Sequence, residues 1–563
     1  MLHLFTNLGV YTVCILVITF IFVLIYEIIN GFHDTANATA TIIYTRALHP
    51  YFAVFISGLC NFFGVIMGGL SVAYAIVHLL PIDFLLMKIN SIHELIMIFS
   101  MLLSAILWNL CTWYFGLPSS SSHTLIGSII GITFIHSLVN KKALVQSLNI
   151  SQLIDIFISL IISPLIGFVL SVFVLLLVRI YCYFVKKKFN YINLTADERY
   201  KKDGISTPPF LIRVGLIISS AGVSFSHGAN DGQKGIGLIM LALMSVAPAE
   251  FIINLNSSTY DINKTRSAVV DFYKYCIRNY DAIDFNIFSC SKKYMLMSNK
   301  NCVSFFPMSF SYFYVYPYVY FINNSDLFLL SEYFVNDSFV FEFICKNNFI
   351  VLKYDNVLLK NNEYDNLFQI MLVVNYVLFL LKNLEDYNNL NFDQRIQVRY
   401  FLVYISDVIT ELLKFKNLSI LDRDFLINLR KDLLNTIEYA PIWIVVSVAL
   451  SLSLGTMIGW KRVVITIGEK IGKKNITYLQ GFLSQVISAI SIGVASYVGK
   501  PVSTTHVLSS AIIGTMLVEG DGVRFKTVKN ILMAWILTLP ASMLLSSILY
   551  LFLLFVLVFF GLS

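Results

Sequence analysis

Two stretches of the chain, GLPSSSSHTLIGSIIG at residues 116–131 and GKPVSTTHVLSSAIIG at residues 499–514, share one pattern. Eight of the 16 aligned positions are identical, and Ser121 and Ser122 align with Thr504 and Thr505, which keeps the hydroxyl groups. Each stretch passes from Gly-x-Pro through a run of hydroxyls to a histidine and then into an apolar segment. An internal repeat of this kind predicts two structurally related halves.

A shorter pair of segments precedes the two stretches, GFHDTAN at 31–37 and GANDGQK at 228–234, with Asp34 aligned to Asp231. The spacing between the paired motifs is 186 residues longer in the second half. The polar stretch 251–436 has that same length. We therefore predict two halves of similar layout, with one insertion in the second.

The composition places these halves in a membrane. Hydrophobic residues make up 57% of the 563 residues and charged residues only 13%, against about 25% charged in soluble proteins. This balance excludes an ordinary soluble enzyme and a disordered chain. The net charge of +7 is typical of cytoplasmic loops rather than of nucleic-acid binding. We predict an all-α polytopic membrane protein with these apolar runs: 11–29, 51–80, 95–115, 153–180, 211–222, 236–249, 441–459, 480–498 and 531–560.

Basic loops orient the halves. Residues 186–202, 461–474 and 524–529 are rich in Lys and Arg and are predicted to be cytoplasmic. Each half then crosses the membrane an odd number of times, so the second half is inverted, and segments 118–137 and 501–518 are expected to be interrupted or re-entrant helices. Inverted repeats with broken helices are typical of transporters. The predicted regions are a first repeat (1–180), a basic cytoplasmic linker (181–210), a second repeat (211–250 and 437–563) and a non-membrane insertion on the outer side (251–436).

Polar residues within apolar runs are costly and indicate function. The aligned aspartates Asp34 and Asp231 are predicted to bind the coupling cation together with His33, and Asn37 and Asn230 to bind the substrate. Gly31 and Gly228 permit an interrupted helix. A competing interpretation is that these polar groups cap helix ends and satisfy one another. Further polar neighbours in the two clusters are Asn30, Thr41, Ser226, His227, Gln233 and Lys234.

The hydroxyl segments, residues 119–124 and 503–505, are predicted to bind an oxyanion. A Pro before a Ser run favours a helix start, and a helix N-terminus attracts anions through its free N–H groups. The alternative is ordinary N-capping. His123 and His506 are either a proton or hydrogen-bond relay or packing residues. The predicted substrate-binding hydroxyls are Ser120, Ser121, Ser122, Thr124, Ser503, Thr504 and Thr505.

These motifs resemble those of the inorganic phosphate transporter (Pit) family, particularly its bacterial low-affinity members. The resemblance rests on GFHDTANA (31–38), PSSSSHT (118–124), GANDGQKGIG (228–237) and PVSTTHV (501–507), and it extends over nearly all of the membrane part. It implies a secondary active transporter, not an enzyme, that imports phosphate across the bacterial inner membrane. The alternatives are a sodium-coupled phosphate or sulfate symporter of the same superfamily, and an anion channel.

The resemblance also implies partners. In the bacterial branch, phosphate travels with a proton as a neutral complex with a divalent cation (Mg, Ca or Zn), and no cofactor is permanently bound. The hydroxyl segments would hold the phosphate oxygens. His33 stands where the family often has Asn, which favours proton coupling over sodium. The sequence is compatible with a homodimer and gives no indication of a nucleic-acid partner.

Overall fold

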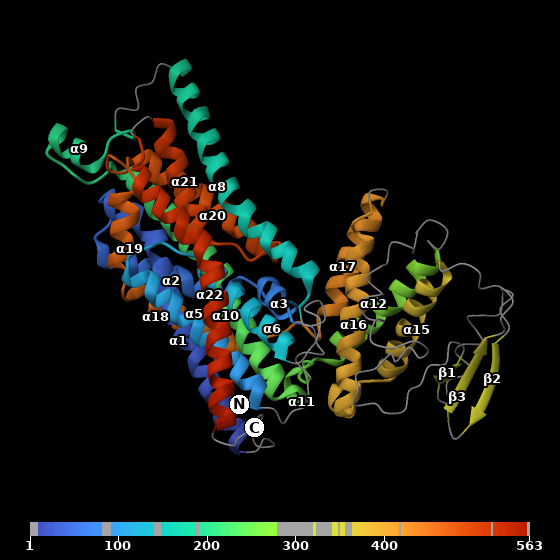
Figure 1. Cartoon of the computed structure of the whole chain (residues 1–563). Coiled ribbons are helices and arrows are strands. Elements are labelled where there is room, and N and C mark those ends of the chain that lie inside the picture. Colours follow the sequence, from blue (N-terminus) through green and yellow to red (C-terminus); the bar gives the residue numbers. More distant parts are fainter. Residues whose placement is uncertain are drawn as a thin grey trace. The chain divides into compact units, whose positions relative to one another are not determined.

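The computed structural model describes residues 10–80, 92–139, 148–185, 191–278, 319–322, 341–346, 349–354, 363–415, 418–519 and 522–559. The chain forms two compact units (Figure 1). The first, here called the membrane unit, comprises Met1–Phe251 and Glu438–Ser563. The second, the insertion unit, is Ile252–Ile437.

The described part of the membrane unit is helical. Its first-half helices are α1 (Val10–Tyr44), α2 (Pro50–Met67), α3 (Ser71–Val77), α5 (Ile92–Tyr114), α6 (Ser121–Val139) and α8 (Ile150–Val185), and the short helix α9 (Ala196–Asp203) lies in the linker. Its second-half helices are α10 (Phe210–Val246), α11 (Pro248–Phe251), α18 (Ile442–Met457), α19 (Lys461–Ile465), the π-helix η6 (Thr466–Lys470), α20 (Tyr478–Tyr497), α21 (Thr504–Glu519) and α22 (Phe525–Phe559).

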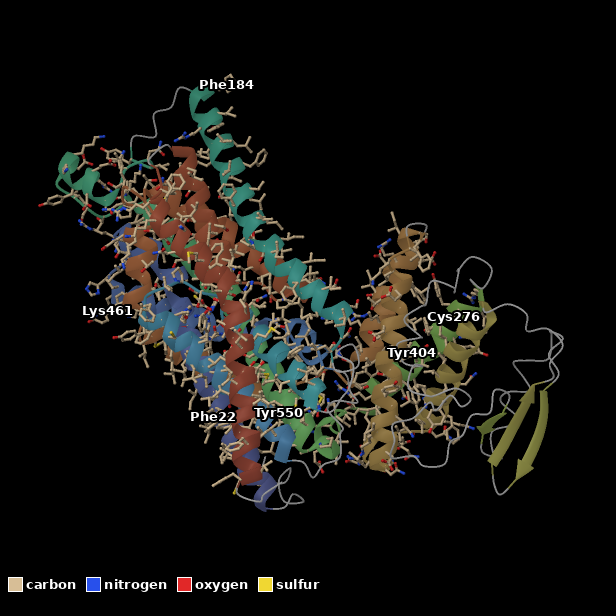
Figure 2. The ribbon with its side chains drawn as sticks, viewed as in Figure 1. Phe22, Phe184, Cys276, Tyr404, Lys461 and Tyr550 are labelled. Atoms are coloured by element: carbon tan, nitrogen blue, oxygen red, sulfur yellow. The ribbon has the colours of Figure 1, made fainter. Side chains whose placement is uncertain are left out.

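Eight helices of the described chain are long and apolar enough to cross a bilayer, and all eight belong to the membrane unit. The predicted polytopic helical architecture is therefore confirmed. The outer faces of α8 and α22 carry exposed apolar side chains such as Leu165 and Phe555, as expected where lipid replaces water. Figure 2 shows Phe184 near the end of α8, where it is also exposed.

The helices that carry the two aspartates are not interrupted, although glycines in both would permit it. Helix α1 runs unbroken through Gly31 and Asp34, and α10 runs unbroken through Gly228 and Asp231. The glycines instead allow close helix crossings. A side chain at Gly31 would collide with the α18 backbone, and one at Gly228 would collide with the α2 backbone.

Two tight turns lead into the hydroxyl segments. The aligned glycines Gly116 and Gly499 have φ of 64° and 75°, a conformation that glycine adopts readily and other residues rarely. After these turns the chain stays non-helical until α6 begins at Ser121 and α21 at Thr504. Helix pairs α5–α6 and α20–α21 thus form two hairpins, each with its hydroxyl segment just after the turn.

The insertion unit, for which the sequence predicted no strands, contains helices and a small sheet. Its helices are α12 (Thr259–Arg278), α15 (Glu363–Leu381), the 3₁₀ turn η5 (Tyr387–Asn389), α16 (Phe392–Leu412) and α17 (Ile420–Leu434). The antiparallel sheet has the order β1-β3-β2, from β1 (Val319–Ile322), β2 (Phe341–Lys346) and β3 (Phe349–Tyr354).

One buried arginine joins the ends of the insertion unit. Nη1 of Arg399, on α16, donates to the carbonyl oxygen of Ile252 at 2.8 Å and to that of Ile437 at 2.7 Å. The amide of Asn254 also donates to the carbonyl of Thr436 at 3.0 Å. The chain therefore enters and leaves this unit at neighbouring points.

Candidate functional site

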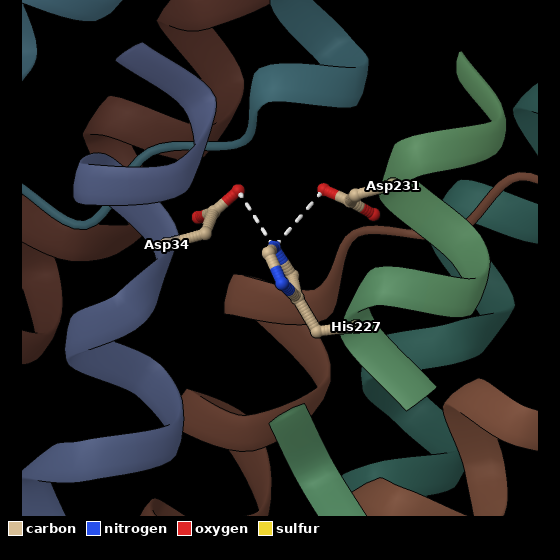
Figure 3. Close-up of side chains that lie close together, drawn as sticks. All are labelled: Asp34, His227 and Asp231. Atoms are coloured by element: carbon tan, nitrogen blue, oxygen red, sulfur yellow. Dashed lines mark ion pairs between the residues drawn. The ribbon is translucent and has the colours of Figure 1, made fainter. Parts of the chain in front are cut away.

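The two aligned aspartates face each other across the interface of α1 and α10. His227 lies between them, with Nε2 3.9 Å from Oδ2 of Asp34 and 3.5 Å from Oδ2 of Asp231 (Figure 3). All three side chains are buried, and one ligand atom from each lies within 4.8 Å of the others. With Lys234 they form what we call the charged centre.

The ring of His227 is oriented by a second set of polar groups. Its Nδ1 lies 2.9 Å from Oδ1 of Asn61, whose amide nitrogen donates to Thr456 at 2.8 Å. This places a proton on Nδ1 of a neutral ring, so that Nε2 presents a lone pair to the two carboxylates. Three acceptors facing one another are stable only with a cation or a proton between them.

Lys234 supplies a fixed positive charge at the other side of Asp231. Its Nζ lies 2.6 Å from Oδ1 of Asp231 and 3.2 Å from the carbonyl of Val502, and it also donates to Ser122. The three ammonium protons therefore have three acceptors. With both aspartates ionised and His227 neutral, the charged centre carries one net negative charge.

The first turn of α6 brings a serine between the aspartates. Oγ of Ser121 lies 3.1 Å from Oδ2 of Asp34 and 3.3 Å from Oδ2 of Asp231. From the other half, Thr505 at the start of α21 donates to Oδ1 of Asp34. The repeat therefore places both hydroxyl segments against the charged centre, as a shared binding site would require.

Within the hydroxyl segments, some hydroxyl groups cap a helix and others do not. Ser120 accepts from the backbone N–H of His123 at 3.2 Å, and Ser503 accepts from that of His506 at 3.3 Å. Both are thus ordinary N-caps, the competing interpretation at these two positions. Thr504, by contrast, has a buried hydroxyl without a hydrogen-bond partner among the described residues.

Two further predicted positions bond to backbone. Thr124, in the first turn of α6, donates to the carbonyl of the cap residue Ser120 at 3.0 Å. Asn230 holds the segment before α21, because its amide nitrogen donates to the carbonyl of Lys500 at 3.2 Å and its oxygen accepts from the N–H of Val502 at 3.3 Å. Asn37 belongs to α1, but its side chain lies outside the described part of the chain.

The histidines occupy two places. The ring of His33 lies 3.4 Å from Asp34 through Nδ1 and 3.2 Å from Oγ of Ser119 through Nε2. His123 and His506, aligned in the repeat, lie with ring centroids 4.7 Å apart, and His506 stacks on Trp535 at 4.0 Å. The structure thus pairs the two aligned histidines, at the N-terminal turns of α6 and α21.

Sequence reasoning gave no role to three buried residues at the α1–α10 interface. His227 and Lys234 were recognisable as polar residues near Asp231, but their orientation depends on contacts with Asn61 and Ser122 from other helices. The third, Glu27, stands alone in an apolar run. The only indication in the sequence was that a carboxyl group within a membrane span is costly and therefore suggests a function.

The chain was compared with known protein families, sequences and structures. Residues 30–546 match the model of the family described as "Phosphate transporter family". The chain is 47% identical over 560 residues to the low-affinity inorganic phosphate transporter PitA of Escherichia coli K12, covering 98% of this chain and 99% of that protein. It is 46% identical over 550 residues to the low-affinity inorganic phosphate transporter of Buchnera aphidicola from Acyrthosiphon pisum, with the same coverage. A solved sodium-dependent phosphate transporter aligns at 17% identity and a TM-score of 0.47, over 96% of this chain and 99% of that one.

Proposed function

The chain belongs to the phosphate transporter family, and we propose that it imports inorganic phosphate across the bacterial cytoplasmic membrane by secondary active transport. It is a transporter rather than an enzyme. The observation that carries the proposal is the meeting of Asp34 and Asp231, from two aligned motifs, with hydroxyls from two aligned helix N-termini.

Phosphate would be held at the starts of α6 and α21. The N–H groups of a first helical turn and the positive end of the helix dipole favour an oxyanion. The hydroxyls of Ser121, Ser122, Thr504 and Thr505 add donors without adding charge. Because the hydroxyl of Thr504 is buried without a partner among the described residues, a phosphate oxygen could take it as a donor at little cost.

A cation would enter with phosphate because the charged centre, with His227 neutral, carries a net negative charge that repels an anion alone. Asp34, His227 and Asp231 offer two carboxylates and one imidazole within ligand distance of each other. This set suits a divalent cation such as Zn²⁺, and carboxylates with water also suit Mg²⁺ or Ca²⁺. We treat this ion as cargo, carried as a metal–hydrogenphosphate complex.

The proton is proposed as the driving ion. A neutral metal–phosphate complex has no charge for sodium to offset, and an imidazole at the site is a poorer ligand for a hard cation than oxygen is. A proton moving with the neutral complex would make uptake electrogenic.

Swapped helix packing supports inverted repeats. Gly31 of α1 lies against α18, while its aligned partner Gly228 of α10 lies against α2. Likewise Gly131 of α6 lies against α22, while the aligned Gly514 of α21 lies against α8. Each half thus packs on the other in equivalent ways, as expected when two inverted repeats enclose a site at the membrane midplane.

The deciding experiment is phosphate uptake in proteoliposomes under an imposed proton gradient, with and without Mg²⁺. Proton symport predicts gradient-driven accumulation that a protonophore abolishes and that sodium does not change. Excess sulfate should compete poorly. Accumulation driven by sodium alone would move the chain to the sodium-coupled alternative, and flux that equilibrates without coupling would indicate a channel.

A further inference from the structure

A third carboxyl group lies at the α1–α10 interface, apart from the charged centre. Glu27 is fully buried, and neither oxygen of its carboxyl group has a hydrogen-bond partner among the described residues. Two turns of α1 separate it from Asp34, so both side chains lie on one face of the helix. A buried carboxyl group without a partner inside a membrane span is costly and indicates a function.

The structure makes room for this carboxyl group. A methyl group added to Gly235, on α10, would lie 2.5 Å from Oε1 of Glu27. Gly235 follows Lys234 directly and lies one turn beyond Asp231, so Glu27 is displaced along the two helices from the charged centre. Glycine at 235 is therefore what lets α10 accommodate a glutamate on α1.

Asn30 is a second buried polar side chain on α1, close to Glu27. It lies one turn from Glu27 on α1 and is fully buried; neither amide atom makes a hydrogen bond of standard geometry among the described residues, yet the amide is close enough to interact with the Glu27 carboxyl group. Its carbonyl can accept from a protonated carboxyl group, and its NH₂ can donate to an ionised one. The pair can therefore satisfy both protonation states of Glu27.

We propose that Glu27 carries the coupling proton of phosphate uptake. The carboxylate takes a proton from water on the outer side and becomes the neutral acid. It returns that proton to water on the inner side, so no other reactant is consumed. The titratable groups that influence Glu27 are Tyr26 on its own helix and His227, Asp231 and Lys234 on α10.

This inference rests on proton symport and assigns the proton to a place distinct from the metal–phosphate cargo. Neither Glu27 nor Asn30 bonds to the three proposed cargo ligands, Asp34, His227 and Asp231. Separate sites would allow the carrier to exchange phosphate without moving the proton. That separation is what an experiment can measure.

The test compares Glu27→Gln with Glu27→Asp in proteoliposomes. Glutamine mimics the neutral acid and cannot release a proton. We expect Glu27→Gln to lose gradient-driven accumulation at least 10-fold while keeping phosphate exchange, measured at equal phosphate on both sides, within about 2-fold of wild type. Glu27→Asp should keep part of the driven uptake. The matched control Glu469→Gln, at an exposed glutamate, should leave both activities unchanged.

Two results would overturn the assignment. Full gradient-driven accumulation by Glu27→Gln would show that the carboxyl group is not needed for coupling. Equal loss of exchange and driven uptake in Glu27→Gln would show a structural role instead. A wild-type protein that ignores a protonophore would refute proton symport itself, which is a separate failure.

Discussion

Nζ of Lys234 lies 2.6 Å from Oδ1 of Asp231, three residues earlier on α10, and both side chains are fully buried. An ion pair inside a membrane span is stable only while both partners are present. The pair leaves the other oxygen of Asp231 facing His227. Lys234 thus pairs with Asp231 without filling the space between the two aspartates.

Replacing Lys234 with Met should destabilise the protein strongly. Breaking a buried ion pair by removing one partner costs about 3–5 kcal/mol, and adding Asp231→Asn to the same variant should recover much of that loss. The measurement is the thermal unfolding midpoint in detergent. Lys500→Met is the matched control, because Lys500 pairs with Asp155 at the surface, where a pair contributes about 0–1 kcal/mol. Equal shifts in the two single variants would contradict this account.

Asp34→Asn and Asp231→Asn should each reach the membrane but lose most gradient-driven phosphate uptake. Either change removes an anionic ligand from the charged centre. Uptake of labelled phosphate, normalised to the amount of transporter, tests this. Asp155→Asn makes the same chemical change at an exposed position and should transport normally. Wild-type uptake by either buried variant would remove that aspartate from the mechanism.

Neighbouring serines should give different phenotypes. Ser120→Ala removes a helix cap and should cost about 1 kcal/mol of stability without changing the apparent affinity for phosphate. Ser121→Ala removes the hydroxyl between Asp34 and Asp231 and should weaken that affinity, by about 1–2 kcal/mol for a hydrogen bond near charge. Thermal unfolding and the KM for phosphate separate the effects. Equal changes of stability and of KM in the two variants would contradict the assignment of Ser120 to helix capping and Ser121 to the binding site.

The insertion unit is proposed to lie outside the cytoplasm. A cysteine placed at Tyr260, which is 74% exposed on α12, should react with an impermeant maleimide applied to spheroplasts of a variant lacking the other cysteines. In a second variant that keeps only the native Cys276 on α12 (Figure 2), the thiol should not react, because it is buried and burial raises its pKa to about 12. Lys201→Cys, on α9 in the linker predicted to be cytoplasmic, should react only after permeabilisation. The reverse pattern would invert the topology.

Local sequence signals identified the hydroxyl segments correctly as helix starts. Proline followed by serine or threonine specifies a helix N-terminus through contacts within a few residues, so α6 and α21 could be placed. The same signals could not separate the caps, Ser120 and Ser503, from Ser121 and Thr505, which face the charged centre. That distinction depends on which neighbouring helix each hydroxyl meets.

Contacts between distant helices account for what the sequence left open. Gly31 and Gly228 suggested broken helices, because a glycine's freedom is visible in sequence whereas a helix crossing is not. Glu27 looked like an isolated polar residue because its neighbour Gly235 is more than 200 positions away. The strands of the insertion unit lie in a stretch whose composition gave no strand prediction.

Helix α1 packs against α18, which is synthesised only after the whole insertion unit. The 186 residues of the insertion unit separate α10 from α18, and at about 5–20 residues per second the ribosome needs roughly 10–40 s to make them. During that delay Asp34 lacks Thr505, since α21 does not yet exist. Asp231, in contrast, has Lys234 on its own helix from the moment α10 forms. Asp231 is therefore neutralised by Lys234 within α10 before synthesis is complete, whereas Asp34 gains its contact with Thr505 only after α21 has been made.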